Sequence, residues 1–199
     1  KLPPEDTESY DNALEIYNAS QKAKRIISRL SNLSRKGVPG EPRPVRLDPL
    51  AAQVLEVAAP ARPKNVRVET GFAAGDGLIL GDETQLFQLT LNLVLNAFEA
   101  LSAQGGTVRV STAARGGRVT LRVADNGPGV PDEVKAQIFD PFFTTKGSGK
   151  GIGLGLAIVQ QIVEAHGGAI SLDSAQGQGT AFTVSFPAAP PEGEGPPPA

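Results

Sequence analysis

The chain contains no cysteine, no methionine, no tryptophan and only one histidine, His166. Without cysteine, a disulfide, a thiol nucleophile and a cysteine metal site are all excluded. A single histidine also excludes a histidine-rich metal cluster and a relay between two histidines. Aromatic residues make up 5% of the sequence and hydrophobic residues 40%. The core must therefore be built mainly from Val, Leu, Ile and Ala.

Strong charge and long apolar runs are absent too. A formal net charge of −2 gives no strong attraction to nucleic acid or to an anionic membrane. No apolar run reaches the roughly 18–20 residues that span a bilayer, and no signal peptide is present. Because position 1 is Lys and not Met, we expect a piece of a longer cytoplasmic protein, and any membrane anchor would lie outside the present sequence.

Residues 1–36 contain the pattern of a helix that packs against another helix. Within 8–36, apolar residues recur at spacings of 3 and 4, namely at Ile16, Ala19, Ala23, Ile26, Leu30 and Leu33. One helix cannot bury this seam alone, so it needs a partner from the same chain or another subunit. A helix packed on its own domain is the alternative. Residues 37–45 are rich in helix breakers and are interpreted as a linker.

Residues 46–187 mix helix and strand patterns. Helices are expected at about 46–59, 83–102 and 154–166, and strands at 65–70, 78–80, 107–111, 118–123, 169–173 and 180–186. The later strands come in hairpin-like pairs, one of them joined by a turn at 114–117. This order indicates an α/β domain whose mixed sheet carries helices on one face. The Pro- and Gly-rich tail, 188–199, is expected to be disordered.

Two asparagines interrupt the apolar helix expected at 83–102. Asn92 and Asn96, within NLVLNAFEA, are four residues apart and share a helix face. A buried amide without a partner costs about 1–3 kcal/mol, and its carbonyl oxygen is a suitable ligand for Mg²⁺. Glu99 follows one turn later on the same side. Two surface asparagines are the alternative explanation.

A turn with two glycines, DNGPGV, follows the strand at 118–123. Asp125 can accept a hydrogen bond from an exocyclic amine such as adenine N6, and Gly127 and Gly129 let a flat ring approach the backbone. Taken alone, the segment is better explained as an ordinary turn, because it consists of turn-forming residues.

An aromatic loop and a second glycine-rich run complete the pattern. FDPFFTTK, a packed loop when taken in isolation, ends in Lys146, which can reach a phosphate as a point charge. Five glycines at alternate positions, 147–155, then run into the helix at 154–166, where freed amides and the helix N-terminus form an anion site. The run matches neither a P-loop nor a dinucleotide fingerprint. A flexible structural loop is the alternative.

Taken in order, these segments resemble the catalytic domain of sensor histidine kinases, in the superfamily that includes gyrase-type, Hsp90-type and mismatch-repair ATPases. NLVLNAFEA resembles the N box, DNGPGV the G1 box, FDPFFTTK the F box, GKGIGLGLAIV the G2 box and GQGTAFTVSFP the last strand motif. The resemblance covers about 46–187. It implies a two-layer α/β sandwich of the Bergerat type, with a mixed, mostly antiparallel sheet under three helices and a lid between about Ile138 and Gly153.

The resemblance also implies a role for each matching residue in holding ATP and Mg²⁺. Asp125 holds adenine with Thr180 behind it, Asn96 ligates Mg²⁺, Asn92 supports the phosphates, and Lys146 contacts the γ-phosphate in the closed lid. Asn92, Asn96 and Lys146 are the implied catalytic residues. The other implied nucleotide-binding residues are Glu99, Gly127, Gly129, Val130, Phe142, Thr145, Gly151, Ile152, Gly153, Leu154, Gly155 and Leu156.

Details of the motifs refine this expectation. Glu99-Ala100 and the TTK before the glycines are similar to the nitrogen-regulator type of kinase. Asn92 occupies the position where related ATPase clamps usually have a glutamate base. An amide cannot be that base, so hydrolysis of ATP by water should be poor.

The phospho-accepting histidine of the family normally lies on the first helix of a two-helix hairpin. Here 8–36 resembles only the second helix, and His166, in EAHGG, is expected to cap a helix C-terminus. We therefore expect ATP·Mg²⁺ binding without self-phosphorylation, together with aberrant self-association. The expected partners are a response-regulator receiver domain and the missing first helix or a second kinase subunit, with no nucleic acid and no membrane contact.

Two other hypotheses stay open. One is a related ATPase clamp or a protein-serine kinase of the same superfamily, against which Asn92 and the helix at 8–36 argue. The other is a degenerate nucleotide-sensing or dimerisation module, against which the intact Asn96, Asp125 and Gly151/Gly153 argue.

Overall fold

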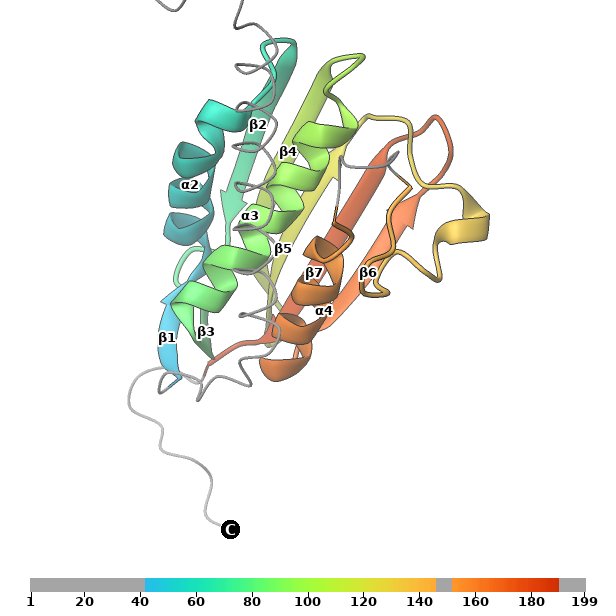
Figure 1. The fold of residues 1–199 in the computed structure, drawn as a ribbon. Helices are drawn as coiled ribbons and strands as arrows, with labels where there is room; N and C mark the ends of the chain where they lie inside the picture. The colour runs from blue at the N-terminus through green and yellow to red at the C-terminus, as the bar shows by residue number, and fades with distance from the viewer. Residues whose placement is uncertain (1–41, 146–151, 190–199) are drawn as a thin grey trace, which may run out of the picture. The chain divides into compact units, whose positions relative to one another are not determined.

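The structure is a computed structural model that describes residues 42–145 and 152–189 (Figure 1). The chain divides into two compact units, Lys1–Pro39 and Gly40–Ala199, and only the second contains described residues. The helix predicted at 8–36, Lys146, Gly151 and most of the predicted tail lie outside the described residues. No helix in the described ranges is long and apolar enough to cross a membrane.

The helices and strands follow the predicted order. The helices are α2 (Leu47–Ala58), α3 (Glu83–Ala100) and α4 (Gly155–Ala165), with 3₁₀ turns η2 (Ala59–Ala61) and η3 (Asp132–Val134). The strands are β1 (Arg43–Arg46), β2 (Val66–Ala73), β3 (Leu78–Gly81), β4 (Gly106–Arg115), β5 (Arg118–Asp125), β6 (Ala169–Ser174) and β7 (Thr180–Pro187). All three predicted helices and all six predicted strands in this part of the chain are therefore present.

Five strands form one mixed sheet in the order β2-β4-β5-β7-β6. Only β2 and β4 are parallel, and the other neighbours are antiparallel. The predicted mixed, mostly antiparallel sheet is confirmed. The turn between β4 and β5 is reduced to Gly116 and Gly117, whose φ angles of 59° and 71° suit a two-residue hairpin loop.

Strand β1 was not predicted. Its first three residues lie in the segment interpreted as a linker, 37–45, and it pairs antiparallel with β3 as a separate two-stranded sheet. Only Val45 of its four residues is buried, so the local pattern is too short to indicate a strand. Pro44 is tolerated because proline is confined to edge strands. The pairing with β3, which is distant in sequence, makes this segment a strand.

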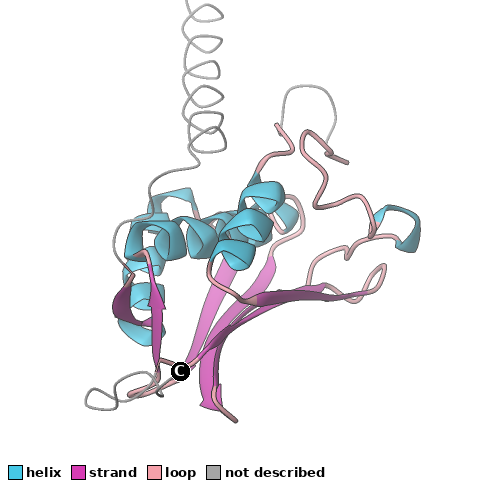
Figure 2. Ribbon diagram, turned by 90° about the horizontal axis from the view of Figure 1, so that it is seen from below, coloured by secondary structure: helices cyan, strands magenta, loops and turns pink. Residues whose placement is uncertain are grey.

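The three helices cover one face of the five-stranded sheet and leave the other face open (Figure 2). α3 packs against both α2 and α4 and contacts β4 and β5. Strand residues that alternate toward the helices are buried, and so is one face of α3. The fully buried side chains include Leu86, Leu89, Leu93, Val108, Val110, Val119 and Leu121. The core is thus aliphatic, as the composition predicts, with Phe186 as its largest fully buried side chain.

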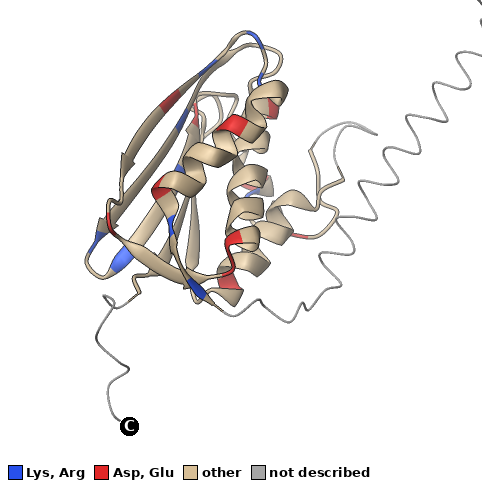
Figure 3. Ribbon diagram, turned by 90° about the vertical axis from the view of Figure 1, so that its left-hand side faces the viewer, with Lys and Arg blue, Asp and Glu red and all other residues tan. Residues whose placement is uncertain are grey.

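Within the described helices and strands, positive charge lies only on the strands, whereas acidic residues lie on both layers (Figure 3). α2, α3 and α4 contain no Lys or Arg, and their charged residues are all acidic. Arginines lie instead on the strands, where Arg109 pairs with Glu69 at 2.6 Å and Arg118 donates to the Ser185 hydroxyl at 2.9 Å. Because the Arg109–Glu69 pair is exposed, it contributes at most about 1 kcal/mol to stability. The main consequence is a helix layer without positive charge.

Candidate functional site

Asp125, the last residue of β5, lies in a row of side chains across one end of the sheet. The strand register makes Thr180 its partner on β7 and makes Ser174 the partner of Thr180 on β6. Cross-strand partners point to the same face of a sheet, so all three side chains face the helix layer. The row brings residues from two predicted motifs, DNGPGV and GQGTAFTVSFP, to one place, together with Ser174.

The Asp125 carboxyl group is half-buried and tied to the turn that follows it. Its Oδ1 accepts a hydrogen bond from the Gly127 N–H at 2.8 Å. Burial raises its pKa, because desolvation penalises the charged form, while the backbone N–H groups of Gly127 and Thr180 act in the opposite direction. The site therefore holds a carboxylate that is poorly solvated and still needs donors.

Glycine is required at two positions of the G1 turn. A Cβ on Gly127 would lie 2.7 Å from Asp125 Oδ1, so a side chain would block the hydrogen bond. Gly129 has a φ of 72°, and a Cβ there would lie 2.0 Å from the Ala175 carbonyl oxygen. The turn thus packs tightly against the loop between β6 and β7, and neither position has room for a side chain.

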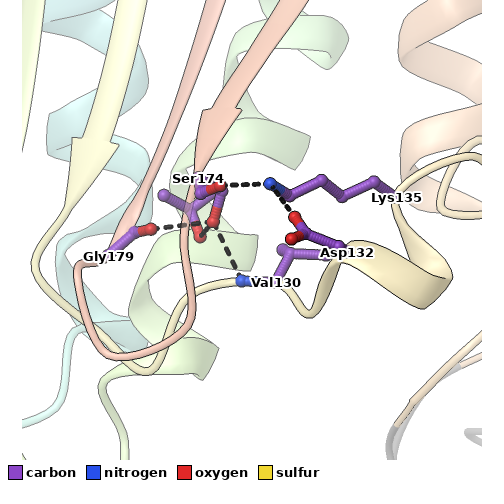
Figure 4. Close-up of polar contacts among 6 residues, drawn as sticks. Val130, Asp132, Lys135, Ser174 and Gly179 are labelled. Carbon is purple, nitrogen blue, oxygen red and sulfur yellow. Dashed lines mark hydrogen bonds and ion pairs between the residues drawn. The ribbon is translucent and has the colours of Figure 1, made fainter.

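Polar contacts hold this turn to the β6–β7 hairpin (Figure 4). Val130 N–H donates to Ser174 Oγ at 2.9 Å, and Ser174 Oγ donates to Gly179 O at 2.8 Å. Lys135 Nζ donates to the Ser174 carbonyl oxygen and pairs with Asp132 at 2.6 Å. Neither Ser174 nor Lys135 was predicted from the sequence as a site residue. Ser174 lies opposite Thr180 because of the register of the β6–β7 hairpin. That register, if known, is the one signal that could have indicated Ser174.

Asn96 of α3 lies close to the beginning of α4. The helix is capped by Asp82, whose carboxylate accepts from Thr84 N at 2.8 Å and Gln85 N at 3.2 Å. Asn92 and Asn96 are half-buried in the helix. The Asn96 amide lies 3.8 Å from the point that a Cβ on Gly155 would occupy. The N box and the G2 box are therefore neighbours in space.

Asn92 carries an unsatisfied donor. Its Nδ2 atom is buried and has no hydrogen-bond partner among the described residues. Leaving such a group unpaired costs about 1–3 kcal/mol, so the native structure retains an amide that a ligand acceptor would satisfy. A phosphate oxygen is an acceptor of this kind, which fits the phosphate role that the resemblance implies for Asn92.

The C-terminal half of α3 also reaches the G1 turn. The Cβ position of Gly127 lies 3.4 Å from Leu101 Cδ2 and 3.6 Å from Ala100 Cβ. Asn96 lies one turn before Ala100 on the same helix. One helix thus connects the Asp125 turn with the start of α4, and the two groups of predicted residues belong to one site.

Helix α4 begins at Gly155 without a side-chain cap. Uncapped N–H groups and the helix dipole favour an anion at this end. Leu154 before it is fully buried, whereas Ile152, Gly153 and Leu156 are half-buried. Leu154 therefore exposes neither its side chain nor its backbone in this structure.

The aromatic segment is held to the loop before α4. Phe142 N–H donates to Gly153 O at 2.9 Å, and Phe142 has a positive φ of 68° with 62% of its surface exposed. Phe139 packs edge-to-face on Phe182, with ring centroids 6.3 Å apart. Thr145 is exposed. Glu99 of α3 is exposed as well, while Lys146 and Gly151 are outside the described ranges.

His166 lies away from this site and is fully engaged. Its Nδ1 donates to Ile162 O at 2.7 Å, and its Nε2 accepts from Asp82 N–H at 3.0 Å. Its ring packs edge-to-face on Phe186 at 6.0 Å. The predicted capping role at the helix C-terminus is confirmed, and the ring also joins the end of α4 to the start of α3.

A metal ion at this site would need a ligand and water to supply most of its coordination shell. The described residues contain no group of three or more His, Cys, Asp and Glu side chains able to hold a metal ion. Mg²⁺ at nucleotide sites commonly takes one or two protein ligands and completes its shell with phosphate oxygens and water. The oxygen of Asn96, beside the start of α4, fits that requirement.

Comparison with known proteins decides the family. Residues 81–190 match the family described as histidine kinase-, DNA gyrase B- and HSP90-like ATPase. The chain belongs to this family. The match spans the sequence from the N box to the end of β7, and so includes every predicted site residue.

Named relatives place this ATPase domain among sensor histidine kinases. Sensor histidine kinase ZraS of Salmonella typhimurium is 37% identical over 189 residues, which are 92% of this chain and 39% of that protein. The crystal structure of full-length ShkA in complex with AMPPNP has a TM-score of 0.77 and 33% identity, and covers 95% of this chain and 40% of that one. Histidine kinase ThkA in complex with the response regulator protein TrrA has a TM-score of 0.75 and 28% identity, and covers 96% and 54%.

These matches confirm the predicted fold class and the identification as a histidine kinase ATP-binding catalytic domain. The chain spans 39% of the length of the ZraS proteins that it resembles. No comparison distinguishes the nitrogen-regulator type, which stays a prediction.

Proposed function

We propose that the chain binds ATP·Mg²⁺ and transfers the γ-phosphoryl group to a histidine on another segment or subunit, for relay to a response-regulator aspartate. The observation that carries this proposal is the meeting of three motifs around the C-terminal half of α3. Asp125 and its glycine turn lie at one end of that half, and Asn96 with the uncapped start of α4 lies at the other.

Different residues contact the base, the phosphates and the metal ion of the bound nucleotide. The ionised Asp125 carboxylate accepts a hydrogen bond from the adenine amino group, and the backbone at Gly127 and Gly129 lies against the ring. Asn92 donates to a phosphate oxygen, and the N-terminus of α4 attracts the phosphate charge. Bound through Asn96, Mg²⁺ would neutralise charge on the phosphate oxygens.

Residues of the lid contact the γ-phosphoryl group. Lys146, with Thr145 before it, supplies a cation that offsets charge as the phosphoryl group leaves ATP. The remaining predicted contacts come from the glycine loop and the start of α4. They are Gly151, Ile152, Gly153, Leu154, Gly155 and Leu156, with Val130, Phe142, Glu99 and Thr180 around the base and lid.

The acceptor is external to this chain. Its one histidine uses both ring nitrogens in hydrogen bonds within the fold, which supports the inference that the chain does not phosphorylate itself. The partners we infer are a first helix or second kinase subunit that carries the histidine, and a response-regulator receiver domain. ThkA, in complex with a response regulator protein, is a precedent for the second partner. We further infer a cytoplasmic location, where ATP is present.

The choice against an ATPase clamp rests on Asn92. A buried amide cannot take a proton from water, so phosphoryl transfer to water should be slow. The degenerate-module alternative is tested by binding itself.

Titration of a fluorescent ATP analogue, with and without Mg²⁺, tests the proposal. Wild type should bind in the micromolar range, Asp125→Asn should lose at least about tenfold in affinity through loss of a charge-assisted hydrogen bond, and Asn96→Ala should lose the Mg²⁺ dependence. Asp173→Asn, a carboxylate change on the exposed part of β6, is the matched control and should bind as wild type.

Transfer is then tested by adding a two-helix domain that carries a histidine. Labelled phosphate should appear on that domain and not on the chain itself. A folded wild-type chain that binds no nucleotide would contradict the kinase function in favour of a degenerate module. Rapid release of inorganic phosphate without a histidine domain would favour an ATPase.

A further inference from the structure

The hydroxyl group of Ser174 is the centre of the polar contacts that join the G1 turn to the β6–β7 hairpin (Figure 4). Its Oγ lies 2.9 Å from Val130 N, 2.8 Å from Gly179 O and 3.1 Å from Thr180 Oγ1. Ser174 and Thr180 are each only 9% exposed. Buried hydroxyl groups in such a cluster must share their protons in a definite order.

The partners of Ser174 determine which group donates. A serine hydroxyl has one proton and two lone pairs. The Val130 N–H can only donate and the Gly179 carbonyl can only accept, so the Ser174 proton points to Gly179 O. The lone pair that remains faces Thr180 Oγ1, which must therefore be the donor in that contact. The reverse order would leave two oxygen atoms 2.8 Å apart with no proton between them.

This order fixes what the Thr180 hydroxyl can offer to anything else. Its proton is committed to Ser174, so only its lone pairs are free. Thr180 is the register partner of Asp125, whose ionised carboxylate is also only an acceptor. The row across β5 and β7 therefore presents acceptors and no hydroxyl donor. A row of acceptors favours a purine with an amino group at C6, which can donate, over one with a carbonyl group, which cannot.

We propose that Ser174 is a positioning residue for base selection, which holds the Thr180 hydroxyl as an acceptor and so strengthens the preference for a 6-amino purine over a 6-oxo purine. Ser174 has no proton or lone pair left for a ligand and acts only through Thr180. The inference rests on the proposed function, because it takes Asp125 and Thr180 as the residues that meet the base.

The test compares the affinities of ATP and ITP, in which a carbonyl group replaces the 6-amino group. In Ser174→Ala the Thr180 proton is released and can be donated to a 6-oxo group. The ratio of ATP to ITP affinity should then fall by about 3- to 10-fold, the range expected for one neutral hydrogen bond. In a Thr180→Val background the Ser174→Ala change should leave the ratio unaltered. Ser171→Ala, at an exposed position of the same strand, is the control and should keep the wild-type ratio.

Equal loss of ATP and ITP affinity in Ser174→Ala would overturn the inference and leave Ser174 a purely structural tie. A shift in the Thr180→Val background as large as in wild type would do the same. A wild-type chain that binds neither nucleotide would overturn the proposed function and base selection together.

A second measurement needs neither a variant nor a nucleotide. In the ligand-free wild-type chain, the Thr180 hydroxyl proton should exchange slowly with water and show a nuclear Overhauser contact to the Ser174 β-protons. A Thr180 proton in fast exchange would overturn the assignment even if ATP binds as proposed.

Discussion

At the scale of single residues, the site retains groups that the fold alone leaves poorly satisfied. Asp125 is a half-buried carboxylate whose pKa is raised by desolvation despite two backbone donors. Asn92 has a buried amide nitrogen with no partner in the described residues. An apolar residue at either position would avoid these costs. Their presence beside uncapped helix N–H groups is what a site for a polar, anionic ligand requires.

The raised pKa of Asp125 gives the ligand-free protein a pH dependence of known sign. The folded state binds this proton more tightly than the unfolded chain, so the free energy of unfolding rises as pH falls from the raised folded pKa toward the unfolded value. At pH 7 the half-buried charge is a net cost to folding, because desolvation outweighs the two backbone donors. Asn carries no charge at any pH. We therefore expect the melting temperature of Asp125→Asn, relative to wild type, to be higher at pH 7 than near pH 4.

Thermal unfolding of both proteins across that range, without nucleotide, measures the difference. If the difference in melting temperature between the two proteins does not vary with pH, burial does not raise the pKa of Asp125. Nucleotide affinity of wild type should move the opposite way and weaken as the pH falls, because a protonated Asp125 loses its acceptor charge.

At the scale of elements, the β6–β7 hairpin supports the site from behind. Gly179 has a φ of 86°, and a Cβ there would lie 2.1 Å from the Asp125 carbonyl oxygen. Gly177 has a φ of 78° and no atom within 4 Å of its Cβ position. Both glycines need the left-handed conformation, but only Gly179 allows β7 to approach Asp125 closely. The conformation of the β6–β7 turn at Gly179 therefore helps to determine the position of Asp125.

These two glycines give a matched pair of variants. Gly177→Ala should lower the free energy of unfolding by about 1–2 kcal/mol, the cost of a left-handed alanine. Gly179→Ala should cost about 2–5 kcal/mol, since overpacking against the Asp125 backbone adds to that cost. Urea unfolding checks both values, and nucleotide affinity should fall only in Gly179→Ala. Equal destabilisation by the two changes would show that the backbone at Asp125 can move without cost.

At the scale of the whole molecule, the described residues form one α/β unit that begins before α2. β1 pairs with β3, and Arg46 of β1 binds Asp76 at 2.8 Å. Ile79, opposite Val45, is 1% exposed. The compact unit that starts at Gly40 includes this pairing.

Two truncations test this division. A chain that starts at Gly40 should keep the wild-type melting temperature and nucleotide affinity. A chain that starts at Leu47 loses β1 and uncovers Ile79, at a cost of about 1.5–3 kcal/mol for the lost side-chain burial. With about 2–4 °C per kcal/mol for a domain of this size, its melting temperature should fall by several degrees. If the chain that starts at Gly40 is less stable than the full chain, residues 1–39 contribute to the stability of the fold.

The sequence by itself determined the order of elements and the chemistry of the motifs. The helix expected at 83–102 and the turn expected at 114–117 could be predicted, because helix periodicity and turn formation depend on neighbouring residues. The aliphatic core followed from the low aromatic content of the sequence. The joint order of N, G1, F and G2 motifs indicated the family, which the match over 81–190 confirms.

Only the tertiary structure decided which residues support those motifs. β1 is a strand because β3 pairs with it, and Ser174 became visible because β6 and β7 bring it beside Thr180 and the G1 turn. The unsatisfied Asn92 amide and the raised pKa of Asp125 likewise arise from burial by distant segments. Local pattern specifies a residue's backbone and type, whereas its burial and hydrogen-bond partners depend on long-range packing that a single sequence does not display.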